Sequence, residues 1–147
     1  MNRAEVVELI VAARLRKGLQ WAEVADAVGA SKEWVTAACL GQMTLSETQA
    51  VAVASLFGLP DEALPLLQAP PYRGSLPTVV PGDPLIYRFY ELVTVYGTTL
   101  KELIAEAFGD GIMSAIDFRM DLAREPDPAG DRVKITMSGK FLPYRSY

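Results

Sequence analysis

The middle of the chain holds a proline-rich segment that regular structure cannot cross. Residues 68–84 read QAPPYRGSLPTVVPGDP, with five prolines and two glycines. Proline lacks a backbone N–H and fixes φ, so repeated prolines exclude both helix and paired strand. A structureless stretch of 17 residues is also long for a loop inside one compact fold. We therefore expect a linker at 68–84 between a domain at 1–67 and a domain at 85–147.

The first of these domains has the pattern of a small helical bundle. Apolar residues recur at helical spacing, and glycines stand where each apolar run ends. Ser31 and Ser46 are well suited to cap two of the helices, and Pro65 is expected to break the last one. The predicted helices cover residues 2–17, 21–28, 32–40, 48–57 and 61–68.

The second domain begins with helical sequence as well. LIYRFYELVTVYG predicts a helix that Gly97 ends, and LKELIAEAF predicts another that Thr98 or Thr99 caps and Gly109 ends.

After Gly109 the spacing of apolar residues changes from the 3.6-residue period of a helix to the two-residue period of a strand. IMSAIDFRMDL at 112–122 and RVKITM at 132–137 alternate apolar and other residues, as strands with one apolar face do. EPDPAGD supplies turn residues between them, and Ser138 and Gly139 are expected to turn the chain again. The fold class is therefore α+β, with a helical first domain and a mixed second one.

Each domain has only about 65 to 70 residues, a size at which one core gives marginal stability. Half of all residues are hydrophobic, yet no run approaches the ~18 apolar residues of a membrane span. We interpret the apolar excess as buried contacts in a homo-oligomer. The first residues lack the cleavage site of a signal peptide, so we expect a cytoplasmic protein without membrane contact.

Composition excludes several kinds of chemistry. The chain has no histidine and a single cysteine, Cys39, so a disulfide within the chain and a thiolate metal cluster are both excluded. Eighteen acidic residues against 14 basic ones do not give the electropositive surface of a nucleic-acid binder. No GxGxxG or GxxxxGK[ST] loop is present. These absences exclude histidine, thiolate-metal and phosphate-loop chemistry.

Arg88 and Glu91 are the charged residues of an otherwise apolar helical stretch. At spacing i, i+3 they share one helix face, and a helix that is apolar nearly all round is usually buried. They are either an exposed ion pair of about 0.2–0.5 kcal/mol or a buried cation beside a carboxylate, which suits a small anion.

Ser114 is a hydroxyl on the apolar face of a predicted strand, after the FGDG turn. One interpretation is a spacer bonded to backbone. The other is a site residue, and because no histidine can activate it, it fits a hydrogen-bond donor better than a nucleophile.

The stretch YRFYELVTVYGTTLKELIAEAFGDGIMSAIDF resembles the signature region of the cyanase (cyanate hydratase, cyanate lyase) family, as do WVTAACLGQ and GKFLPY. The resemblance implies that Arg88, Glu91 and Ser114 are catalytic. It implies decomposition of cyanate with bicarbonate, through an unstable carbamate, to ammonia and carbon dioxide, with bicarbonate as co-substrate and no cofactor. It also implies a helix-turn-helix-like first domain and a second domain intertwined with its partner, in a homodecamer of five dimers.

Two other classes of function stay open at this point. WAEVADAVGASKEWVTAACLGQ has the rhythm of a helix-turn-helix, so a transcriptional regulator is the alternative, although its second helix offers Lys32 alone as a cation. The other class is a purely structural oligomerisation module, which would release no ammonia from cyanate.

Overall fold

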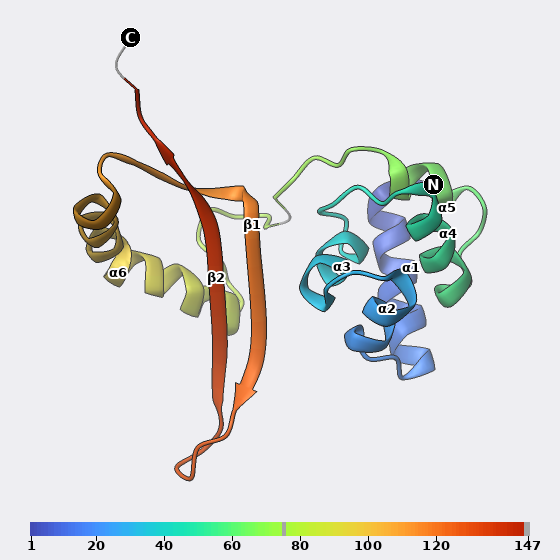
Figure 1. Cartoon of the computed structure of the whole chain (residues 1–147). Coiled ribbons are helices and arrows are strands. Elements are labelled where there is room, and N and C mark those ends of the chain that lie inside the picture. Colours follow the sequence, from blue (N-terminus) through green and yellow to red (C-terminus); the bar gives the residue numbers. More distant parts are fainter. Residues whose placement is uncertain (75, 146–147) are drawn as a thin grey trace. The chain divides into compact units, whose positions relative to one another are not determined.

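The chain separates into two units at the proline-rich segment. The computed structural model describes residues 1–74 and 76–145, and its two units are Met1–Ser75 and Leu76–Tyr147 (Figure 1). Between Gln68 and Pro84 the described residues form neither helix nor strand. The fold is mixed α+β as expected, because the first unit is helical and the second joins one helix to a two-stranded antiparallel sheet.

Five short helices form the first unit, close to the predicted positions. Ser31 Oγ accepts a hydrogen bond from the N–H of Trp34, and Ser46 Oγ accepts one from the N–H of Gln49, so both predicted caps are confirmed. The helices are α1 (Arg3–Lys17), α2 (Trp21–Val28), α3 (Lys32–Cys39), α4 (Glu47–Phe57) and α5 (Ala63–Gln68).

The predicted break at Pro65 is wrong. Helix α5 begins at Ala63 and continues through Pro65 to Gln68. Proline here occupies the first turn, where the backbone N–H has no acceptor within the helix, so its missing donor costs nothing.

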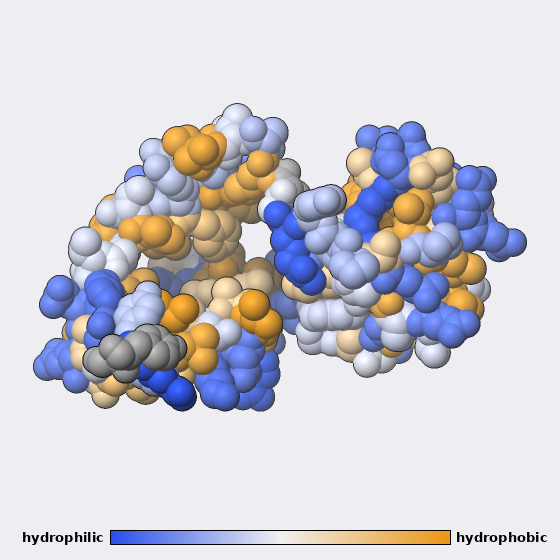
Figure 2. Space-filling view, turned by 90° about the horizontal axis from the view of Figure 1, so that it is seen from above, coloured by the Kyte–Doolittle hydropathy of each residue, from blue (hydrophilic) through white to orange (hydrophobic). Residues whose placement is uncertain are grey.

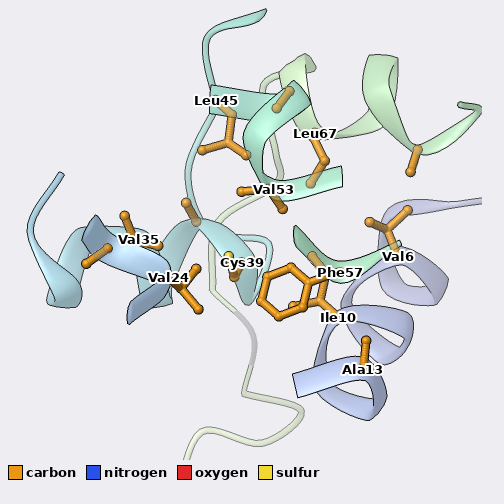
Figure 3. Close-up of a cluster of buried hydrophobic side chains, with 14 residues drawn as sticks. Val6, Ile10, Ala13, Val24, Val35, Cys39, Leu45, Val53, Phe57 and Leu67 are labelled. Carbon is orange, nitrogen blue, oxygen red and sulfur yellow. The ribbon is translucent and has the colours of Figure 1, made fainter. Parts of the chain in front are cut away.

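The buried core of the described chain lies in this first unit. Each of the five helices contributes apolar side chains to it, and Figure 3 shows them meeting between the helices. Burial raises the pKa of the Cys39 thiol to about 12, so this thiol stays protonated near neutral pH and acts as a small core residue. The largest fully buried side chains are Phe57, Ile10, Val6, Val24, Val35, Val53 and Cys39.

One long helix, α6 (Pro84–Phe108), replaces the two helices predicted around Gly97. Asp83 caps its start by accepting hydrogen bonds from the N–H groups of Leu85 and Ile86. The expected end at Gly97 is wrong because an interior glycine costs only about 0.5–1 kcal/mol, which the good helix formers on both sides outweigh.

A β-hairpin follows, formed by β1 (Gly111–Glu125) and β2 (Arg132–Pro143) in antiparallel pairing. The predicted turn at Ser138 and Gly139 is wrong, because β2 passes straight through both residues. Ser138 pairs with Arg119, and Gly139 pairs with Phe118.

The hairpin is interrupted by a bulge where sequence predicted plain alternation. Met113 pairs with Phe141 and Phe118 pairs with Gly139, so residues 114–117 of β1 lie opposite Lys140 alone. A bulge of this kind bends the strand and re-aims its side chains. The apolar and polar positions of β1 therefore do not keep one face along its whole length.

The second unit exposes much of its apolar surface. Helix α6 has no buried residue, and no large apolar side chain of the described part of this unit is buried. Figure 2 shows apolar side chains gathered on the surface of the unit that contains α6 and the hairpin. The expectation that α6 is buried is therefore not met within one chain.

Candidate active site

Helix α6 places Arg88 and Glu91 one turn apart on the same face. Arg88 Nη1 donates a hydrogen bond of 2.7 Å to Glu91 Oε2, and the side chains are 69% and 45% exposed. This carboxylate raises the pKa of the Arg88 guanidinium, first through the hydrogen bond and then through its charge. The pair is thus an accessible cation held by one carboxylate.

An open hollow of about 350 Å³ lies beside this pair. Its wall consists of Arg88 and Glu91 together with the apolar part of α6 at Leu92, Val95 and Tyr96. A guanidinium has five N–H donors, and Glu91 engages Nη1. Donors are left for two oxygens of a bound anion, which a guanidinium can grip bidentately.

Ser114 is placed by the bulge of β1 and is only 8% exposed. Its Oγ accepts hydrogen bonds from the backbone N–H groups of Ile116, at 3.1 Å, and Asp117, at 2.9 Å. A hydroxyl oxygen has two lone pairs, and both are engaged here. What the hydroxyl can still offer is its proton, so the local geometry favours a hydrogen-bond donor over a nucleophile.

The three predicted residues do not form one site within a single chain. Arg88 and Glu91 are joined directly, but Ser114 does not line the hollow beside them. Among residues 1–74 and 76–145, the hydrogen bonds of the Ser114 side chain go to its own strand. A site containing all three needs a further element, such as another subunit.

Sequence reasoning overlooked the backbone around Ser114. The two N–H donors of the bulge and the close approach of β2 at Gly139 come from strand pairing, which alternation alone does not predict. Gly139 itself was a visible signal, since an interior strand glycine often marks a bulge.

Three other features that a functional site can have are absent or weak in the described residues. No group of three or more cysteine, histidine or carboxylate side chains is placed to hold a metal ion. No helix there is long and apolar enough to cross a membrane. In α3, the helix that would read DNA, the single cation Lys32 is paired with Glu33, so this helix offers little for phosphate contacts.

Two family models together match almost the whole chain. The model described as "Cyanate hydratase, N-terminal" matches residues 3–71, and the "Cyanate lyase C-terminal domain" matches residues 78–146.

Individual relatives agree with these models. The chain is 69% identical to a cyanate hydratase of Ralstonia pickettii and 68% identical to one of Cupriavidus necator, over 100% of each chain. The crystal structure of cyanase from T. urticae is similar with a TM-score of 0.81 at 37% identity, covering 94% of this chain and 96% of that one.

Proposed function

Because the chain belongs to the cyanate hydratase family, a family of lyases, we propose that it decomposes cyanate with bicarbonate as second substrate at a site containing Arg88, Glu91 and Ser114. The observation that carries this proposal is the accessible Arg88 guanidinium, held by Glu91 at the edge of an open hollow. The regulator alternative is not favoured, since the relatives are enzymes and α3 pairs its one cation internally.

The main obstacle to this reaction is that both substrates are anions. Two unit charges ~4 Å apart repel by about 4 kcal/mol at an effective dielectric constant of 20. Arg88 offsets this repulsion, because its guanidinium stays protonated at any working pH and can hold two oxygens of one substrate. Covering the apolar wall of the hollow at Leu92 and Val95 by another subunit would lower the local dielectric constant and strengthen that attraction.

The proposed chemistry balances without a cofactor. An oxygen of bicarbonate attacks the carbon of cyanate to form a new C–O bond, and the bicarbonate proton goes to the cyanate nitrogen. The bond between that oxygen and the former bicarbonate carbon then breaks, which releases carbon dioxide and, with a proton from water, leaves carbamate. Carbamate takes up another proton and separates into ammonia and a second carbon dioxide. Ser114 donates a hydrogen bond to the charge that develops during the addition.

Glu91 has a positioning role in this scheme. A further negative charge would oppose anion binding if it were free, but here the carboxylate bonds Arg88 directly. Its bond to Nη1 orients the guanidinium and leaves the other donors for substrate.

We also propose that the active protein is a homo-oligomer, a decamer of five dimers, with sites between subunits. Its support is the exposed apolar surface of α6 and the hairpin, which one chain leaves in contact with water. Burying one large apolar side chain contributes about 1.5–3 kcal/mol, so covering this surface favours association strongly. A second copy also supplies the element needed to bring a Ser114 to an Arg88 and Glu91 pair.

A charge on α6 is expected to break this assembly. Leu103 is 57% exposed on α6, and Leu103→Glu would bury a carboxylate wherever subunits cover the helix. Light scattering of wild type should give the mass of an oligomer, and the variant should give a smaller species with at least ~10-fold less activity.

Leu15→Glu is the matched control, because Leu15 is 66% exposed on α1 of the first unit. It should leave the mass unchanged. A monomeric and fully active wild type would contradict the proposal.

The direct test of the function is ammonia release from cyanate with and without added bicarbonate, in buffer freed of carbon dioxide. We expect turnover to rise from near zero to saturation with bicarbonate, and to survive dialysis against a chelator. Turnover independent of bicarbonate would contradict the co-substrate proposal, and no turnover would favour a structural module. We also propose that the enzyme is cytoplasmic, which cell fractionation would test.

A further inference from the structure

We propose that Gly139 is a positioning residue for Ser114: without a side chain, it lets β2 lie against the bulge that fixes the serine hydroxyl as a hydrogen-bond donor. The proposal rests on the catalytic role proposed for Ser114 above. It adds a residue from the opposite strand that touches no substrate.

The bulge and the Ser114 hydroxyl are linked by hydrogen bonds. Residues 114–117 lie opposite Lys140 alone, and the Ser114 hydroxyl accepts hydrogen bonds from two backbone N–H groups inside that bulge. Ser114 is only 8% exposed, and these two hydrogen bonds hold its hydroxyl against the backbone of the bulge. The orientation of the hydroxyl therefore depends on the path of the backbone through residues 114–117.

Gly139 is where the second strand meets this backbone. A Cβ atom at position 139 would overlap the carbonyl oxygen of Ser114 and would lie 2.6 Å from Cγ of Met113. The methionine side chain can move aside, but the carbonyl belongs to the bulge itself. Gly139 does not have a positive φ, so the glycine is needed for space and not for its conformational freedom.

A second glycine makes the same kind of contact on the other side of Ser114. A Cβ at Gly111 would overlap the carbonyl oxygen of Leu142 and the ring of Phe141. The two strands thus approach closely at the start of β1 and again where the bulge begins. This double approach fixes where the chain enters the bulge.

The chemical consequence concerns the serine proton. With both oxygen lone pairs accepting N–H bonds, the hydroxyl can only donate, and accepted bonds polarise a hydroxyl and strengthen its donor character. A misplacement of about 1 Å can lower a rate ~10²-fold. Moving the Ser114 carbonyl to make room for a methyl group at 139 is a shift of this order.

The test is Gly139→Ala, with Gly82→Ala as matched control. Gly82 also lacks a positive φ, and a Cβ there would meet nothing within 4 Å. We expect Gly139→Ala to lower kcat for cyanate by ~10²-fold with the oligomer mass unchanged, and Gly82→Ala to behave as wild type. Wild-type kcat in Gly139→Ala would overturn the proposal.

A double-mutant cycle separates a positioning role from a general structural one. If Gly139 acts through the serine hydroxyl, Gly139→Ala should cause less than about a twofold further loss in a Ser114→Ala background. Hydrogen exchange at the amides of Ile116 and Asp117 should accelerate in Gly139→Ala and not in Gly82→Ala. Additive losses, or unchanged exchange at both amides, would overturn the proposal.

Two further outcomes are decisive. If Gly139→Ala fails to assemble, the double variant Met113→Ala/Gly139→Ala should be made, because it removes the overlap with the methionine side chain. We expect this double variant to form the oligomer and to keep a low kcat. Full activity in that double variant, or failure of both variants to assemble, would overturn the assignment. Full activity of Ser114→Ala would instead reject the proposed role of Ser114, a result distinct from a failure at Gly139.

Discussion

Replacing Arg88 by lysine is expected to lower kcat for cyanate decomposition by about 10²–10³-fold, the effect of removing a donor that stabilises developing charge. The positive charge is retained, so simple attraction of an anion persists. The planar fork of donors is lost, and an ammonium cannot hold Glu91 and two substrate oxygens in one fixed arrangement. Initial rates of ammonia release should be measured against cyanate and bicarbonate separately.

Arg124→Lys is the matched control for this variant. Arg124 is an exposed arginine of the same unit, paired with Asp131 at 3.1 Å in the hairpin. The same substitution there should leave the rate within about twofold of wild type, because exposed ion pairs contribute only ~0–1 kcal/mol. Equal losses in both variants would mean that Arg88 matters for structure alone.

Glu91→Gln tests the positioning role within the same experiment. The amide keeps the shape but loses the charge that holds the guanidinium, so we expect a smaller loss than in Arg88→Lys, with weaker bicarbonate saturation. Unchanged turnover together with unchanged bicarbonate affinity would reject that role for Glu91.

Replacing Ser114 by alanine is expected to lower kcat by about 10²-fold or more. The substitution removes the proton that the hydroxyl would donate. It also leaves the N–H groups of Ile116 and Asp117 without their side-chain acceptor, and a hydrogen bond of this kind contributes about 0.5–1.5 kcal/mol to stability. Steady-state kinetics and thermal unfolding of the same sample separate the two effects.

Ser138→Ala serves as the control for serine loss in the same hairpin. Ser138 is an exposed residue of β2 paired with Arg119, outside the bulge. Its replacement should change neither rate nor unfolding temperature measurably. A covalent adduct on Ser114 in wild type during turnover would show a nucleophile and contradict the donor role.

Local signals predicted most of the secondary structure. The caps at Ser31 and Ser46 form as expected, because a side-chain acceptor and the orphan N–H groups of a helix start lie within three residues of one another. The errors at Pro65, Gly97 and Gly139 share one cause. Each of these residues destabilises a helix or strand by only a few kcal/mol at most. The size of that cost depends on where in the helix or strand the residue lies, and the residue type alone does not show this.

The candidate site also has one part that local sequence predicts and one part that it does not. The i, i+3 spacing of Arg88 and Glu91 was enough to predict their contact, since a helix brings such side chains together whatever surrounds it. The bonding of the Ser114 hydroxyl was not predictable, because it follows from a shift in the pairing of β1 with residues of β2 about 25 positions further along the chain.

The sequence by itself determined the family, the α+β class and the charged pair on α6, because these depend on motifs and on contacts within a few residues. Only the tertiary structure decided that α6 is one continuous helix with no buried residue, and that Ser114 lies in a bulge against Gly139. The physical reason is how far apart in the sequence the interacting residues lie. Strand register and the covering of an apolar face depend on partners distant in sequence or in another chain, whereas caps and helix spacing do not.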